Sequence, residues 1–68
     1  MKTQNSSIGL VLRINAVCEL VALSKSTVLR LVKAGDFPKS FPLSGYAVGW
    51  SREEVEAWVE ARKNLRQA

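Results

Sequence analysis

Cationic and hydroxyl side chains recur at helical spacing near the middle of the chain, and their chemistry suits contacts with a polyanion. At about 100° per residue, one side of a predicted helix over residues 24–34 collects these side chains: Ser26, Arg30 and Lys33, with Lys25 and Leu29 beside them. The opposite side is apolar and carries Val28, Leu31 and Val32. One side of this helix can therefore pack against a core while the other meets phosphates or base edges.

Each polar side chain of this helix has a candidate role at a DNA duplex. Arg30 can contact a phosphate or a base edge, and its fork can bond guanine twice, which discriminates by roughly 1 to 3 kcal/mol. Ser26 and Thr27 would contact phosphates or bases near the helix start. Phosphate contacts are expected from the lysines: Lys25, Lys33 and Lys39. Two alternatives stay open: the basic residues only solvate an exposed face, or the Thr27 hydroxyl bonds its own helix backbone.

Both ends of this helix are specified locally. The Ser24 hydroxyl can accept from a free amide of the first turn, which makes Ser24 a good N-cap. Gly35 follows the last helical residue, where a left-handed C-cap is favoured. The sequence therefore predicts a short, capped helix.

A shorter helix precedes it with almost no gap. Asn15 can cap this first helix, which is predicted to end near Leu23. Its apolar positions repeat at helical spacing: Val17, Leu20 and Val21. Two helices joined so closely favour a steep crossing over an antiparallel hairpin. That arrangement is a helix-turn-helix, whose second helix enters the major groove.

Short extended segments flank the helical part. The apolar run over residues 8–12 predicts a brief edge strand. Phe37-Pro38 and Phe41-Pro42 stop any helix, because proline lacks the amide donor. Residues 43–50 then offer two extended segments about a glycine turn, which predicts a small hairpin acting as a wing. In the alternative reading the hairpin is a connector that covers the core with three residues: Tyr46, Val48 and Trp50.

A third helix begins at a predicted capping box. Ser51 and Glu54 would satisfy each other's backbone amides. An apolar stripe closes the core, namely Val55, Trp58 and Val59. The outer face is acidic: Glu53, Glu56 and Glu60. Basic residues near the C-terminal end complement the helix dipole, with a second DNA contact as the alternative: Arg62, Lys63 and Arg66.

Composition indicates one small soluble domain. The 68 residues are 47% hydrophobic and 24% charged, and no apolar run approaches the roughly 18 residues of a membrane helix. Residues 1–50 carry six bases and two acids, whereas residues 51–68 carry four of each, so the net charge of +4 lies around the basic helix. The start of the chain lacks the apolar stretch of a signal peptide, so we expect a cytoplasmic protein with a flexible polar tail over residues 1–9.

Several function classes are excluded. Cys18 is the single cysteine and histidine is absent, which rules out an internal disulfide and the usual zinc ligand sets. Cys18 lies among apolar helical residues and is predicted to be a core or boundary residue. Without histidine or a glycine-rich phosphate loop after a strand, we expect no enzyme, no metal, no cofactor and no small-molecule substrate.

An ordered set of short motifs resembles the AlpA family of phage-type DNA-binding regulators. The motifs run from about Leu12 to Arg62 and comprise Arg13-Ile14, Val17, residues 23–27, residues 30–33, Gly35, Phe37-Pro38, residues 47–50, Glu54-Val55 and Ala57-Trp58. The resemblance implies a winged helix-turn-helix, distantly similar to MerR-type domains and small excisionases, in prophage or integrative-element biology. It also implies a recognition helix over residues 24–34 and a wing turn from Ser44 to Tyr46.

Three positions depart from the family's pattern. Tyr46 stands where the family often has a wing arginine, so a phosphate or minor-groove contact becomes a hydroxyl contact. Leu29 stands where the family often has an aromatic residue, and it can contact a thymine methyl but cannot donate a hydrogen bond. Val21-Ala22 replaces the usual threonine-glycine before the turn, and alanine tolerates a positive φ poorly.

The predicted fold is mainly α with a small β-hairpin, a winged helix-turn-helix of three helices plus wing over residues 10–66. The expected function is a regulator that binds double-stranded DNA sequence-specifically, with Ser44 and Tyr46 contacting DNA from the wing. We expect a monomer in solution whose copies associate along DNA. Two alternatives stay open: an excisionase-like factor that binds and bends attachment-site DNA, and a small adaptor that binds a protein through Leu29 and Phe41.

Overall fold

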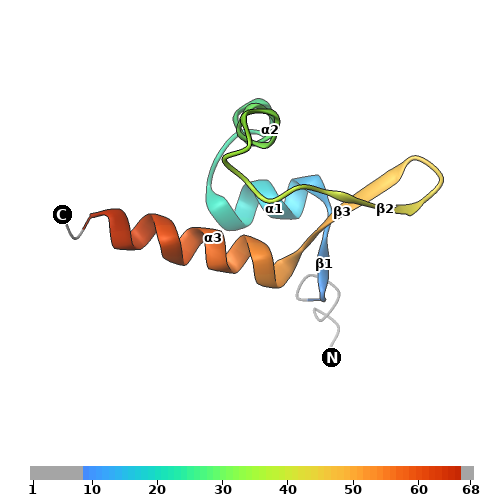
Figure 1. Cartoon of the computed structure of the whole chain (residues 1–68). Helices are drawn as coiled ribbons and strands as arrows, with labels where there is room; N and C mark the ends of the chain where they lie inside the picture. Colours follow the sequence, from blue (N-terminus) through green and yellow to red (C-terminus); the bar gives the residue numbers. More distant parts are fainter. Residues whose placement is uncertain (1–8, 67–68) are drawn as a thin grey trace.

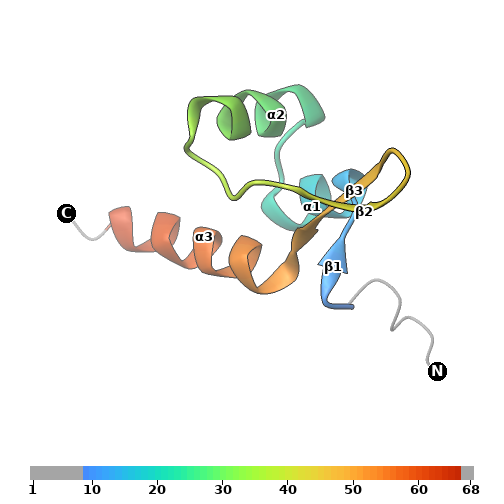
Figure 2. The same cartoon turned by 45° about the vertical axis from the view of Figure 1, so that its right-hand side comes forward.

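Three helices and a small sheet make up residues 9–66, the part of the chain that the computed structural model describes. In chain order the elements are β1 (Val11–Leu12), α1 (Ile14–Val21), α2 (Lys25–Ala34), β2 (Phe41–Ser44), β3 (Ala47–Ser51) and α3 (Arg52–Leu65). Figure 1 shows α1 between α2 and α3, with the hairpin of β2 and β3 projecting away from the helices, and Figure 2 gives the same arrangement from a second side. The predicted fold class is confirmed.

The beginning of the chain bears on two predictions. Residues 1–8 of the predicted polar tail lie outside the described residues, as does Ile8 of the predicted first strand. From Gly9 onward the strand is shorter than predicted and comprises only Val11 and Leu12.

The core draws on strands, helices and the loop after α2. Its buried residues are Leu12, Val17, Val28, Phe37, Trp50 and Val55. Each helix contributes a single fully buried residue, which is a valine in every case. Since the interaxial distance depends on the side chains at the contact, these short side chains let the helices approach closely. Cys18 is half-buried and packs against the core, which confirms its prediction as a boundary residue.

The sheet is antiparallel, with β3 in the centre and β1 and β2 on either side. Leu12 pairs with Trp50, and Phe41 pairs with Gly49. A Cβ atom at Gly49 would lie 2.5 Å from Cγ1 of Val11, so a side chain here would collide with the neighbouring strand. Glycine therefore allows β1 to lie against the hairpin. The predicted edge strand is thus an edge strand of the three-stranded sheet.

Helix α1 begins earlier than predicted. Arg13, not Asn15, is its N-cap residue, and the Arg13 side chain makes no capping hydrogen bond. The chain turns out of β1 directly after Leu12, and the Arg13 carbonyl already accepts from the Val17 amide at 2.9 Å. Sheet pairing therefore sets the start of this helix, and the prediction of Asn15 as the cap was wrong.

Helix α1 also ends earlier than predicted, at Val21 and not near Leu23. Ala22 adopts a left-handed conformation with φ 61°. The Leu23 amide then donates to the Cys18 carbonyl at 3.2 Å, and the Leu23 side chain packs against the core. The positive φ that a glycine would accept easily is therefore imposed on an alanine, as the departure from the family's pattern suggested.

Helix α3 begins where predicted, but its capping box is half formed. The Ser51 hydroxyl accepts from the Glu54 amide at 3.2 Å. Among the hydrogen bonds of residues 9–66, the return bond, in which the Ser51 amide would donate to the Glu54 carboxylate, does not occur. Ser51 is also the last residue of β3, where it pairs with Val11, so strand and helix meet without a loop.

The apolar stripe of α3 is only partly in the core. Val55 is fully buried and Trp58 packs against the core, as predicted. Val59 is half-buried and lines a groove together with Leu20, so its assignment to the core was wrong. The reason is that Val59 faces the space between α1 and α3, where Leu20 is itself 42% exposed and does not cover it. Within residues 9–66, no helix is both long enough and apolar enough to cross a membrane.

Candidate nucleic-acid interface

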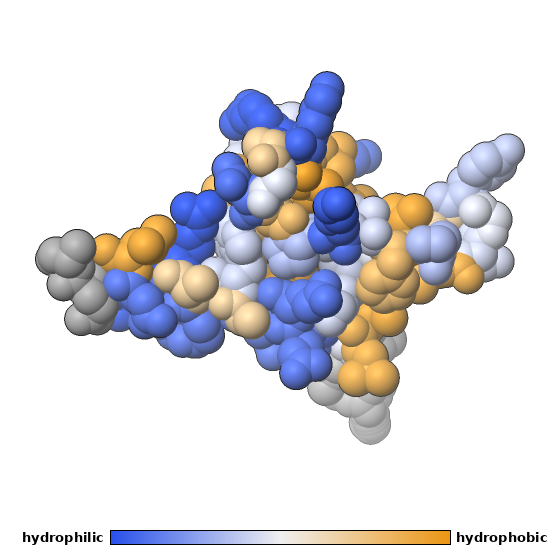
Figure 3. All heavy atoms as spheres, viewed as in Figure 1, coloured by the Kyte–Doolittle hydropathy of each residue, from blue (hydrophilic) through white to orange (hydrophobic). Residues whose placement is uncertain are grey.

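Helix α2 presents its predicted polar face to solvent. The exposed residues there are Lys25, Ser26, Leu29, Arg30 and Lys33. Val28 is fully buried, while Leu31 and Val32 are half-buried against the core. Figure 3 shows strongly hydrophilic side chains gathered over the part of the surface that α2 forms in Figure 1. The two faces of this helix are therefore separated as the residue spacing predicts.

The cations of α2 are not neutralised by neighbouring acids. The helix contains Lys25, Arg30 and Lys33 and no acidic residue. Both ion pairs within residues 9–66 belong to α3, where Arg52 pairs with Glu56 and Lys63 pairs with Glu60. The three charges of α2 are therefore available to phosphates, and any such contact would weaken as salt rises.

Both predicted caps of α2 are confirmed. The Ser24 hydroxyl accepts from the Thr27 amide at 3.2 Å. Gly35 has φ 84°, and its amide donates to carbonyls of the last helical turn. The helix therefore begins with an exposed N-terminal end, where the cap residue Ser24 is followed by Lys25 and Ser26.

Thr27 differs from the other candidate contact residues. It is half-buried, and its hydroxyl oxygen accepts from the Ser24 hydroxyl at 2.9 Å. Ser26 is exposed, with its hydroxyl 3.4 Å from that of Ser24. The Thr27 hydroxyl is therefore engaged in the cap, though with the Ser24 side chain and not with the backbone partner that the alternative reading proposed.

Two indole groups hold the loop that follows α2. The Nε1–H of Trp58 donates to the carbonyl of Asp36 at 2.7 Å, and the Nε1–H of Trp50 donates to the carbonyl of Pro38 at 3.0 Å. Between these carbonyls Phe37 inserts into the core with 4% of its surface exposed. The C-terminal end of α2 is thereby tied to both β3 and α3.

An aromatic and cationic stack continues this contact. The rings of Phe37 and Trp58 meet edge to face with centroids 4.8 Å apart. The Arg62 guanidinium lies over the Trp58 ring, 4.7 Å from its centroid. Arg62 was predicted only to complement the helix dipole, and its contact with Trp58 was not predicted. The spacing of four residues between Trp58 and Arg62 on one helix was the available signal.

The wing carries exposed, uncharged residues. Ser44 lies in β2, Gly45 follows with φ 56°, and the Tyr46 side chain at the turn is fully exposed at 104%. Trp50 is 2% exposed and covers the core, but Tyr46 does not, so the alternative reading holds only for Trp50. Residues 40–51 contain no charged side chain, and the cations Lys39 and Arg52 flank this segment in the chain.

Lys39 lies apart from α2 in the chain. It is exposed on the segment that joins α2 to β2 (Figure 2). The candidate residues therefore fall into three groups, on the α2 face, on this connecting segment and on the wing.

Comparison with known proteins identifies the family. Residues 10–63 match the family model described as "Prophage CP4-57 regulatory protein (AlpA)". The chain belongs to the AlpA family. The match covers every strand, α1, α2 and all but the last two residues of α3, and it confirms the resemblance that the motifs carry. AlpA proteins form a regulatory family and not an enzyme family.

A curated relative comes from Enterobacteria phage P4. This AlpA family chain is 41% identical over 51 residues to the phage protein named "Uncharacterized protein ORF88". The matched region covers 75% of this chain and 58% of the phage protein, so the chain spans little more than half the length of that relative.

Proposed function

We propose that this AlpA family protein binds double-stranded DNA sequence-specifically through α2 and thereby regulates prophage or integrative-element genes. The observation that carries the proposal is the division of α2 into a buried face and an exposed face with three cations and no acid. A helix of ten residues is about 15 Å long and, with side chains, 10–12 Å wide, which matches the major groove.

Individual roles follow from exposure and chemistry. Arg30 is the proposed reader of a base edge, because its guanidinium is exposed in the middle of the face and can bond guanine twice. Leu29 is exposed beside it and can contact a thymine methyl. Phosphate contacts are proposed for the remaining cations, Lys25, Lys33 and Lys39, with Ser26 beside the helix start.

The wing would approach the duplex without charge. Ser44 and Tyr46 are both exposed near the turn and each offers a hydroxyl. Thr27 is proposed as a secondary contact, since its hydroxyl already serves the cap. The electrostatic part of binding would therefore come from α2 and Lys39 alone.

Fluorescence anisotropy across a salt series tests the proposal. The parent should bind a mixed-sequence duplex with a log-log salt slope of about −3 to −5, because about 3 to 5 counterions are released. The variant Arg30→Ala/Lys33→Ala should lose most of this binding while circular dichroism shows an intact fold. As a matched control, Lys63→Ala/Arg66→Ala removes the same two residue types from the far end of α3 and should bind nearly as the parent does.

Two other outcomes would redirect the proposal. If the parent binds no more tightly than an unrelated basic protein and the α2 variant is indistinguishable from it, DNA binding is wrong and the adaptor alternative leads. If selected DNA shows cooperative occupation of repeats at an attachment site, with bending, the excisionase-like function replaces promoter regulation. Protection confined to one promoter supports the regulator.

A further inference from the structure

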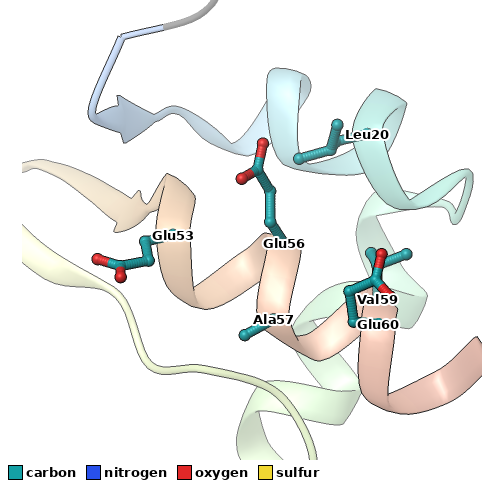
Figure 4. A pocket seen from close by; sticks show the side chains of 6 residues that line it. All are labelled: Leu20, Glu53, Glu56, Ala57, Val59 and Glu60. Atoms are coloured by element: carbon teal, nitrogen blue, oxygen red, sulfur yellow. The ribbon is translucent and has the colours of Figure 1, made fainter. Parts of the chain in front are cut away.

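A shallow groove lies between α1 and α3, away from the exposed face of α2. Its lining residues are Leu20 from α1 and Glu53, Glu56, Ala57, Val59 and Glu60 from α3 (Figure 4). Leu20 is 42% exposed although it is a large apolar residue. The groove is thus lined by three apolar side chains and by three carboxylates of α3.

The first part of α3, beside this groove, is opposite in charge to α2, although α3 as a whole carries four glutamates and three cations. Residues 52–60 contain four glutamates and one arginine, a net charge of −3, whereas α2 contains two lysines and one arginine, a net charge of +3. Of the glutamates that line the groove, Glu56 pairs with Arg52 at 2.8 Å and Glu60 pairs with Lys63 at 3.0 Å, while no ion pair among residues 9–66 engages Glu53. The carboxylate of Glu53 therefore retains its charge for a cationic partner, whereas Glu56 and Glu60 would have to exchange their cations within α3 for those of the partner.

The apolar parts of the two surfaces also correspond. Leu29 is 43% exposed among the cations of α2, as Leu20 is exposed beside the acids of α3. The acidic segment of nine residues is about 13.5 Å long and α2 is about 15 Å long, so the two surfaces match in length. Both helices pack on α1 from different sides (Figures 1 and 2), so the surfaces of one molecule cannot meet each other.

We propose that the α1–α3 groove binds the basic face of α2 from a second copy of this chain. Leu29 of one copy would lie on Leu20, Ala57 and Val59 of the other, with the cations of α2 facing the glutamates. Two such contacts related by a two-fold axis close a dimer. Because the contact covers Arg30 and Lys33, the dimer could not place α2 in a major groove. Self-association and DNA binding would therefore exclude each other.

The competition with DNA rests on the proposed function, whereas the self-association does not. The contact involves one exposed helix face and one shallow groove, so we expect it to be weak. Its charged rim is solvent-exposed, and salt at about 0.5 M should weaken it by about tenfold or more. This protein would thereby hold its own recognition helix covered at high concentration and low salt.

Sedimentation velocity over a concentration series tests the self-association. The parent should dimerise in low salt and dissociate in high salt. Leu20→Lys should abolish the dimer, because it places a cation in the groove, while Leu65→Lys makes the same change at a residue that is 66% exposed and outside the groove, and should leave the dimer intact. A monomeric parent at the highest concentration in low salt overturns the proposal, as does a dimer that Leu20→Lys leaves unchanged.

Charge exchange keeps the test decisive if Leu20→Lys fails to fold. Arg30→Glu/Lys33→Glu and Glu53→Lys/Glu60→Lys should each be monomeric alone and should form a heterodimer when mixed. The absence of a heterodimer between folded variants overturns the proposed contact. A 20-base-pair duplex should dissociate the parent dimer. A parent that binds DNA but does not self-associate contradicts this inference alone. A parent that self-associates but does not bind DNA contradicts the proposed function alone.

Discussion

The indole N–H of Trp58 donates a 2.7 Å hydrogen bond to the carbonyl oxygen of Asp36, a residue 22 positions earlier in the chain. This bond connects α3 to the residue that directly follows the C-cap of α2. It acts together with the bond from Trp50 to Pro38, so two elements outside the helix-turn-helix hold the end of the proposed recognition helix. The orientation of α2 therefore depends on residues that would not themselves touch DNA.

Trp58→Phe should lower the free energy of unfolding by about 1 kcal/mol, because phenylalanine keeps an aromatic ring and loses the hydrogen-bond donor. Urea unfolding followed by Trp50 fluorescence measures this loss. Affinity for a selected operator should fall more than affinity for mixed-sequence DNA, since a loosened α2 still meets phosphates but positions Arg30 less well. Equal losses on both duplexes would show that Trp58 has no positioning role.

Ala22→Gly should raise the free energy of unfolding by about 1 kcal/mol, because glycine adopts the observed φ of 61° without the steric cost that alanine bears. For a chain of this size the gain corresponds to a Tm increase of roughly 4 to 8 °C. Ala57→Gly is the matched control: Ala57 lies inside α3, and the same change there should destabilise by about 1 kcal/mol. A loss of stability in both variants would contradict the left-handed turn.

Gly49→Ala should destabilise the sheet by about 1 to 3 kcal/mol, because the new Cβ atom overpacks the space between the strands. It would lie 2.5 Å from Cγ1 of Val11 and 3.2 Å from the backbone oxygen of Leu12. Val11→Ala should relieve part of this cost in the double variant, and a double-mutant cycle of thermal unfolding measures the coupling. Strict additivity would mean that β1 does not lie against Gly49.

Tyr46→Arg should steepen the salt dependence of DNA binding. The wing turn has no charge, so an arginine at this fully exposed position adds one phosphate contact and changes the log-log slope by about −0.9. Tyr46→Gln, a polar and uncharged replacement, should leave the slope unchanged. An unchanged slope in the arginine variant would show that the wing does not approach the phosphates.

Local features of the sequence determined most of the candidate site. The caps Ser24 and Gly35, the division of α2 into apolar and basic faces and the glycine turn at Gly45 all depend on residues within a few positions of one another. Capping, side-chain periodicity and turn conformation act over that range, so they can be inferred without a fold. The order of the motifs also identified the family, which the match over residues 10–63 confirmed.

Only the tertiary structure decided the features that join distant segments. The pairing of Val11 with Ser51 set the start of α1, and the packing of Leu23 imposed a left-handed conformation on Ala22. The packing of α1 against α3 left Val59 in a groove beside Leu20, and the fold brought Trp58 to Asp36. These contacts are gained only when segments far apart in the chain pack together, and their combined free energy overrides the local preferences of the residues involved.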